Sequence, residues 1–133
     1  MKKKYNALII GFGFWGPILA RNFQSNLYFN VHSICDSNSI NLNKAKNIYP
    51  NSIFYKSYKR ALDNPEIDIV IISTPTKTHY KITKMALSKK KHVFSTRSRG
   101  GKVLKLRTTV LRRLIQIEIS KSLIKEWITC DRL

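Results

Sequence analysis

The sequence places three glycines in the spacing G-x-G-x-x-G, at Gly11, Gly13 and Gly16, within the stretch IIGFGFWGP. An apolar run, residues 5–10, comes directly before this pattern, and a helix-like segment, residues 17–25, follows it. In such a turn the first glycine permits a tight exit from a strand. The second lets a pyrophosphate approach the backbone, and the third lets the helix pack closely on the strand. In this context the pattern predicts the phosphate-binding turn of a dinucleotide-binding fold.

A carboxylate stands where such a fold binds the adenosine ribose. Asp36 comes 20 residues after Gly16, at the end of the apolar segment 29–35. A carboxylate at this place accepts hydrogen bonds from the ribose hydroxyls and repels a 2′-phosphate, which favours NAD over NADP. The alternative is that the glycines form only a turn and that Asp36 only caps the next helix.

Strands and helices are expected to alternate over the first 94 residues. Apolar and β-branched runs predict strands at residues 5–10, 29–35, 52–55, 67–74 and 92–94. The segments between them predict helices at residues 17–25, 40–50, 57–65 and 76–91. A length of 133 residues favours a single domain. We therefore expect an α/β fold with a doubly wound parallel sheet (a Rossmann fold) in the strand order 3-2-1-4-5, without the sixth strand of the complete fold.

The stretch EIDIVIISTPTKTHYKITKMALSKKKHVF, residues 66–94, resembles the N-terminal domain of the Gfo/Idh/MocA family, the glucose-fructose oxidoreductase and inositol dehydrogenase group. That family has an acidic and apolar strand that ends in a small residue, followed by Thr-Pro and then by a His. Thr74, Pro75, Thr76 and His79 match this motif, and KKHVF matches its exit. GFWGPILARNF is similar to members that act on nucleotide-linked sugars. The resemblance extends over residues 4–94.

This resemblance implies the NAD-binding domain of a sugar, cyclitol or nucleotide-sugar dehydrogenase. It implies that the pyrophosphate is lined by Gly11, Phe12, Gly13, Phe14, Trp15 and Gly16, and that Asp36 holds the adenosine ribose. It also implies that the cofactor's nicotinamide half passes along Ser73, Thr74, Pro75 and Thr76, with His79 at the same rim. Two alternatives stay open: Trp15 only packs, and His79 only caps or solvates its helix. His32 and His92 are interpreted as structural.

The catalytic part of the family's motif is absent after Phe94. The family continues with Glu-Lys-Pro, whose lysine helps hold the cofactor and substrate, whereas this chain continues with STRSR, residues 95–99. We also expect this chain to lack the family's α+β substrate domain, which carries the acid-base residues in that family. Hydride transfer needs a positioned carbinol and a base for its proton. We therefore predict no catalytic residue in this chain and a sugar or nucleotide-sugar substrate only for a full-length form. The alternative is a regulatory module that binds NAD without catalysis.

Residues 95–133 differ in character from residues 1–94, and we predict a boundary between them. Six of the ten basic residues in this tail are arginine, against two of fifteen before it. Thr-Arg-Ser-Arg can be encoded ACG AGA AGC CGN, and the same bases read two positions later give Glu-Lys-Pro. The sequence thus favours a frameshift near codons 94–96. The competing interpretation is a genuine basic tail, with a helix over residues 103–128 that binds an anionic surface or a partner.

The net charge of +18 raises nucleic acid as a partner, but the lysines are spread over solvated helix faces, so this alternative is the weaker one. Cys35 and Cys130 form neither a disulfide framework nor a metal-ligand spacing, which fits a reducing cytoplasm. The basic start and apolar run resemble a signal peptide, but glycines and Pro17 interrupt the run. We expect a cytoplasmic protein without a metal or a membrane partner. The family is typically homo-oligomeric, while the state of this chain is open.

Overall fold

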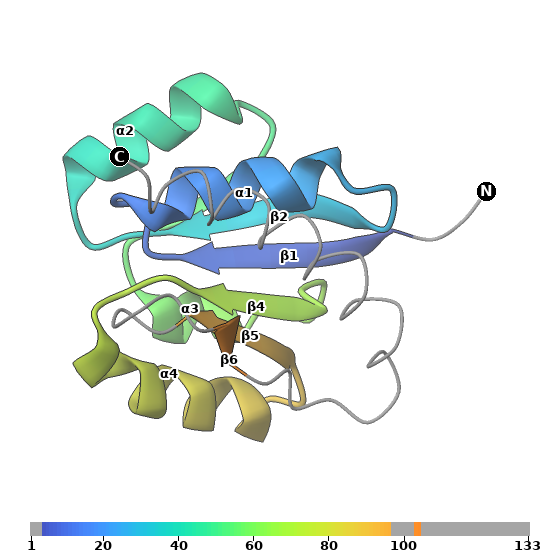
Figure 1. Cartoon of the computed structure of the whole chain (residues 1–133), viewed down its shortest axis with the longest axis vertical. Coiled ribbons are helices and arrows are strands. Elements are labelled where there is room, and N and C mark those ends of the chain that lie inside the picture. The colour runs from blue at the N-terminus through green and yellow to red at the C-terminus, as the bar shows by residue number, and fades with distance from the viewer. Residues whose placement is uncertain (1–3, 97–102, 105–133) are drawn as a thin grey trace.

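The computed structural model describes residues 4–96 and 103–104 of the chain. These residues form a six-stranded sheet in the order β3-β2-β1-β4-β5-β6, with helices on both faces (Figure 1). In chain order the elements are β1 (Tyr5–Ile10), α1 (Trp15–Ser25), β2 (Phe29–Cys35), α2 (Ser39–Ile48), β3 (Ile53–Tyr55), α3 (Tyr58–Leu62), β4 (Ile69–Ile72), α4 (Thr76–Ser88), β5 (His92–Thr96) and β6 (Val103–Leu104). Strands β1 to β5 run parallel. The predicted doubly wound α/β sheet and its order 3-2-1-4-5 are confirmed.

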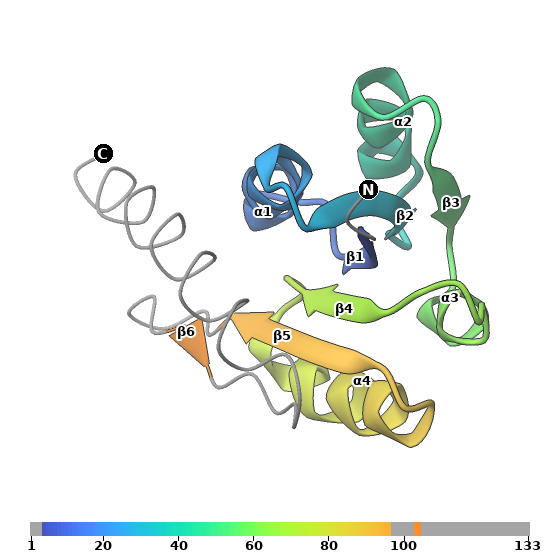
Figure 2. The same ribbon diagram turned by 90° about the vertical axis from the view of Figure 1, so that its right-hand side faces the viewer.

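Two helical layers enclose the sheet. Helices α1 and α2 lie on one face, and α3 and α4 lie on the other (Figure 2). Because successive side chains of a strand point to opposite faces, β1 serves both layers. Ala7 and Ile9 belong to the core under α1 and α2, whereas Leu8 and Ile10 belong to the core over α3 and α4. A continuous apolar run is therefore what a central parallel strand needs.

Most elements begin and end within a few residues of the predicted positions. Helix α1 begins at Trp15, two residues before the predicted start, so Pro17 still lies in the first turn. Proline costs no hydrogen bond there, because the first N–H groups of a helix have no partner within it. Helix α4 ends at Ser88, and Lys90 beyond it adopts a left-handed backbone with φ 59°. That conformation stops the helix before the predicted residue 91.

Strand β2 carries an extra residue at His32. Ala7 pairs with Val31 and Leu8 pairs with Ser33, so His32 has no opposite residue in β1 and forms a bulge. Its ring lies 2.7 Å from the Ser33 hydroxyl and 3.0 Å from Glu66 Oε2. The ring thus connects the bulge to the segment before β4, in keeping with the structural role that we expected for His32.

One expectation about the tail is wrong where the structure describes it. Val103–Leu104 form strand β6 and pair antiparallel with Thr96 and Ser95, so the predicted helix does not begin at residue 103. Strand β6 is not the sixth strand of the complete fold, because it has only two residues and runs antiparallel to β5, so the described parallel sheet has five strands, as expected. The rest of the predicted helix, the arginine-rich segment and Cys130 lie outside the described residues.

Candidate cofactor-binding site

A cleft of about 770 Å³ lies at the carboxyl ends of β1, β2 and β4. The chain leaves β1 toward β2 on one side and later returns to β4 on the other side, so the connections diverge at this point of the sheet. Open parallel sheets bind ligands at such a switch point. Of the residues expected from the sequence, the cleft is lined by Gly11, Gly13, Asp36, Ser73, Thr74 and Pro75.

The three glycines of the loop have different surroundings. Gly11 has φ 93°, and a Cβ atom there would lie 2.9 Å from the Ser73 carbonyl carbon. A Cβ atom on Gly16 would lie 2.2 Å from the Gly11 carbonyl oxygen, which is an impossible contact. A Cβ atom on Gly13, in contrast, would meet nothing within 4 Å. Gly11 and Gly16 are therefore required by the turn itself, whereas Gly13 leaves open space beside the backbone.

Hydrogen bonds fix the glycine loop between its neighbouring strands. The Gly11 N–H donates to the Cys35 carbonyl at 2.8 Å, and the Ser73 N–H donates to the Ile10 carbonyl at 2.9 Å. The Ser73 hydroxyl donates to the Gly11 carbonyl at 2.5 Å. Ser73 thus holds the turn in shape, a role in addition to the cofactor contact expected from the sequence.

Asp36 connects the loop to the start of α2. Its Oδ2 accepts the Phe12 N–H at 2.8 Å and the Asn41 side-chain amide at 3.0 Å, and its Oδ1 accepts the Asn38 N–H at 2.8 Å. A carboxylate has about four acceptor positions. Oδ1 therefore retains capacity for a further donor such as a ribose hydroxyl. The alternative was that Asp36 only caps the next helix. The residue that caps α2 is Asn38, whose side chain accepts the N–H groups of Ile40 and Asn41.

The aromatic residues of the loop divide into buried and exposed ones. Phe12 is buried in the core between the sheet and α1, so what it offers near Asp36 is its backbone N–H. Trp15 is partly buried and packs against the same core, as its alternative interpretation stated. Phe14 is 72% exposed and meets the Trp15 ring edge to face, with 5.3 Å between the centroids. Phe14 is the loop aromatic whose ring is open to a ligand.

The segment after β4 contributes the opposite wall of the cleft. Thr74 and Pro75 line it, whereas Thr76 is exposed outside the lining at the start of α4. His79 is buried, and its Nε2–H donates to the Thr74 carbonyl, since a carbonyl oxygen can only accept. His79 therefore holds the wall in place from behind, which makes it a positioning residue.

Sequence reasoning missed much of the lining. The residues missed are Ser37, Asn41, Lys56, Ser57, Tyr58, Lys59, Thr78, Lys81 and Ile82, together with Ile10 and Cys35 at the strand ends. The signal for Lys56 was available, because the residue after a strand lies at the same sheet edge as the residue after its parallel neighbour. Thr78 and Lys81 could have been placed by helical spacing from the Thr-Pro motif.

Cys35 lies at the bottom of the cleft as a neutral thiol. Burial, together with the adjacent Asp36 carboxylate, raises the pKa of Cys35 to about 12. The thiolate is the reactive form of cysteine, so this thiol is chemically quiet at neutral pH. Among the described residues no group of three His, Cys, Asp or Glu side chains could hold a metal ion.

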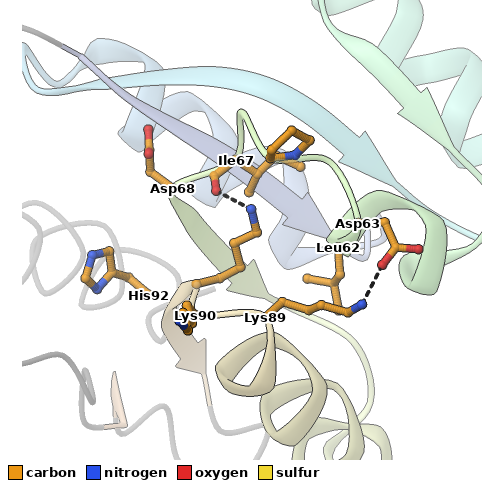
Figure 3. A pocket seen from close by; sticks show the side chains of 9 residues that line it. Leu62, Asp63, Ile67, Asp68, Lys89, Lys90 and His92 are labelled. Carbon is orange, nitrogen blue, oxygen red and sulfur yellow. Dashed lines mark hydrogen bonds and ion pairs between the residues drawn. The ribbon is translucent and has the colours of Figure 1, made fainter.

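A second pocket, of about 460 Å³, lies at the amino ends of β4 and β5, away from the glycine loop (Figure 3). Lys89 forms an ion pair with Asp63 at 2.8 Å there, as Figure 3 shows. Lys91 Nζ donates to the carbonyls of Asn64 and Ile67, both at 2.8 Å. Burial lowers the pKa of Lys91, and the nearby Asp68 carboxylate opposes that shift. Lys89 and Lys91 therefore already have partners within the protein, and their contacts hold the turn before β4.

The model of a family described as "Oxidoreductase family, NAD-binding Rossmann fold" matches residues 5–96. The chain belongs to the Gfo/Idh/MocA family. The resemblance drawn from the Thr-Pro motif is thereby confirmed, and with it an NAD-binding domain of the Rossmann type. The match includes β1 to β5 and every residue expected to touch the cofactor.

Oxidoreductases and dehydrogenases are similar to this chain over about the same region. The oxidoreductase YrbE of Bacillus subtilis (strain 168) is 27% identical over 94 residues, which are 71% of this chain and 28% of that protein. Scyllo-inositol dehydrogenase from Lactobacillus casei, solved with NAD(H) and scyllo-inositol, superposes with a TM-score of 0.66 at 26% identity, over 70% of this chain and 28% of that one. Myo-inositol 2-dehydrogenase from Lactobacillus plantarum has the same TM-score at 31% identity, over 70% and 28%.

This Gfo/Idh/MocA chain therefore spans less than a third of the length of the relatives it matches. Its similarity to them is confined to the domain that carries the glycine loop. No helix among the described residues is long and apolar enough to cross a membrane.

Proposed function

We propose that the cleft binds NAD(H), with the pyrophosphate over Gly13 and the adenosine ribose at Asp36. The open space at Gly13 is the observation that carries this proposal. The turn would be stable with a side chain at this position, so its glycine is explained by a ligand that must approach the backbone. The free acceptor capacity of Asp36 Oδ1 supports the ribose contact. The bound cofactor supplies hydride chemistry, while this chain supplies binding and orientation.

The substrate class proposed for the longer protein is a cyclitol or sugar alcohol. Two of the similar solved proteins are inositol dehydrogenases by name, and both exceed 25% identity with this chain. Within the 133 residues we propose that no hydride transfer occurs, because no lysine follows Phe94 where the family's motif has one. A base for the carbinol proton would have to come from another part of the protein.

We also propose that residues from about 95 onward are read in a shifted frame. The arginine-rich composition and the hidden Glu-Lys-Pro codons support this, and the family match ends at residue 96. Sequencing the gene decides the matter: codons for Thr96 to Arg99 that differ from ACG AGA AGC CGN refute the idea. Restoring the frame should yield NAD reduction with a cyclitol, which the 133-residue chain should lack.

Isothermal titration of the 133-residue chain with NAD tests the binding proposal. NAD should bind, and Gly13→Ala should weaken its binding by about tenfold or more, because the added methyl group occupies the pyrophosphate's approach. Thermal unfolding of Gly13→Ala should match that of the parent, which separates loss of binding from loss of fold. Lys84→Ala, on the exposed part of α4, is the control and should bind NAD as the parent does. A chain that folds and does not bind NAD refutes the proposal.

A further inference from the structure

The part of the cleft around Asp36, where the adenosine is expected, should repel a 2′-phosphate less strongly than an isolated carboxylate would. A carboxylate selects NAD when its oxygens are free to accept both ribose hydroxyls. Here three protein donors already occupy Asp36: the N–H groups of Phe12 and Asn38 and the amide of Asn41. Asp36 can therefore accept about one further ribose hydroxyl without displacing a protein partner.

Lys56 lies beside Asp36 because of the sheet register. Cys35 pairs with Tyr55 in the parallel β2–β3 ladder, and the Asp36 N–H donates to the Tyr55 carbonyl at 3.1 Å. The residue after Tyr55 is therefore next to the residue after Cys35. Lys56 lines the cleft at this point, and Lys59 lines it from the first turn of α3.

The charges that line the cleft are predominantly positive. Asp36 is the one carboxylate in its lining, against the three ammonium groups of Lys56, Lys59 and Lys81. In the part of the chain that the structure describes, none of these lysines is in an ion pair, whereas Lys89 at the other end of the sheet is paired with Asp63. Lysines without a partner carboxylate in a ligand cleft are available to an anionic ligand.

A pyrophosphate alone does not account for Lys56 and Lys59. It is expected at Gly13, where the loop and the start of α1 supply backbone N–H groups. Lys56 instead stands next to Asp36, where the ribose of the adenosine is expected. Two ammonium groups against one carboxylate leave a net positive charge, which attracts a dianion at this place.

We propose that Lys56 and Lys59 form a subsite for the adenosine 2′-phosphate, so that this chain binds NADP as well as NAD. The inference rests on the proposed cofactor function and refines it. Asp36 holds the remaining ribose hydroxyl, and the lysines hold the phosphate. The consequence is a cofactor site with little discrimination between the two dinucleotides.

Titration of the 133-residue chain with two mononucleotides isolates this subsite. The probes 5′-AMP and 2′,5′-ADP differ only in the 2′-phosphate. We expect 2′,5′-ADP to bind at least as tightly as 5′-AMP, and NADP to bind within about tenfold of NAD. Raising the salt concentration should weaken 2′,5′-ADP more than 5′-AMP, because its extra contact is between charges.

The double variant Lys56→Gln/Lys59→Gln tests the assignment of the residues. It should lower the affinity for 2′,5′-ADP and NADP by about tenfold or more while changing that for 5′-AMP and NAD less than about threefold. Lys44→Gln, on the exposed side of α2 outside the cleft, removes the same kind of charge and should affect neither pair selectively.

The outcomes separate the two proposals. Failure to bind any of the four nucleotides refutes the cofactor function itself. Binding of NAD together with a preference of more than about 100-fold over NADP leaves that function standing and refutes the subsite. An equal response of NAD and NADP to the Lys56/Lys59 change, or an equal effect of Lys44→Gln, also refutes the assignment.

Discussion

Gly11, Gly13 and Gly16 occupy one turn, yet each meets different surroundings. Gly11 needs a backbone angle that other residues avoid, and Gly16 needs the absence of a side chain where two backbones meet. Gly13 needs neither for folding. A sequence pattern that treats the three positions alike therefore combines two structural requirements with a third glycine that we attribute to the proposed cofactor.

A pair of alanine substitutions should separate these requirements. Gly16→Ala should lower the free energy of unfolding by about 1–3 kcal/mol or more, because its Cβ atom would overlap the Gly11 carbonyl. Gly13→Ala should change the free energy of unfolding by less than about 1 kcal/mol. Urea unfolding followed by circular dichroism measures both. Similar losses in the two variants would contradict the division made here.

The stability should depend on the Cys35 thiol at alkaline pH. Burial raises the pKa of Cys35 from 9.0 to about 12. Between these values the unfolded chain releases the proton and the folded chain keeps it, so stability falls as pH rises. Below pH 9 both states keep the proton and the contribution is constant. Thermal unfolding at pH 8 and pH 10 should show a smaller decline for Cys35→Ala than for the parent. An equal decline would mean that Cys35 does not contribute.

At the scale of elements, two neighbouring lysines with different backbone conformations follow the end of α4. Lys89 is the capping residue with φ −87°, and Lys90 follows with φ 59°. The left-handed conformation costs a residue with a side chain about 1–2 kcal/mol, whereas glycine adopts it freely. Lys91 lies beyond the helix, and its N–H donates to the Ala86 carbonyl in the last turn at 3.0 Å.

Replacing Lys90 by glycine should therefore stabilise the protein. We expect Lys90→Gly to raise the free energy of unfolding by about 0.5–1 kcal/mol, since the lost strain exceeds the added freedom of the unfolded chain. Lys89→Gly is the matched control and should lower it, because Lys89 has an ordinary backbone and an ion pair with Asp63. Chemical denaturation gives both values. A loss in both variants would show that the Lys90 conformation is not strained.

The turn before β4 depends on a lysine from a distant part of the sequence. Lys91 Nζ donates to the carbonyls of Asn64 and Ile67 and so joins the start of β5 to the loop after α3. Lys91→Met keeps the length of the side chain and removes both hydrogen bonds. It should lower the free energy of unfolding by about 1–2 kcal/mol, because the relief of burying a charge offsets part of the loss. Lys84→Met, at an exposed position of α4, should be neutral.

At the scale of the whole molecule, the order of the sheet determines which regions open first. Strands β1 and β4 lie in the middle of the sheet, with neighbours on both sides and cores on both faces, and β3 lies at one edge. Native-state hydrogen exchange should therefore be slowest at residues 7–10 and 69–72 and faster at residues 53–55. Faster exchange in β1 than in β3 would contradict the central place of β1 in the core.

The sequence predicted the sheet well because its strands are apolar runs and its connections are helices. β1 and β4 are buried on both faces, which gives the strongest signal that a strand can have. The positions of the glycine loop and of Asp36 at one cleft were also predictable, because they depend on local geometry and a fixed spacing. The cleft's lysines were not, because Lys56 is placed beside Asp36 only through the pairing of β2 with β3. Strand β6 likewise depends on a pairing with β5 that no local pattern reveals.

For the proposed cofactor site, the hydrogen bond from the Phe12 N–H to Asp36 limits how the cofactor preference can change during evolution. Replacing Asp36 to admit a 2′-phosphate would also remove an acceptor from the glycine loop and leave a donor of the turn without its partner. A lysine gained on the neighbouring strand changes the charge of the pocket and leaves that turn intact. Proteins descended from this domain should therefore change their preference between NAD and NADP by substitutions around β3, while they keep the carboxylate at the end of β2.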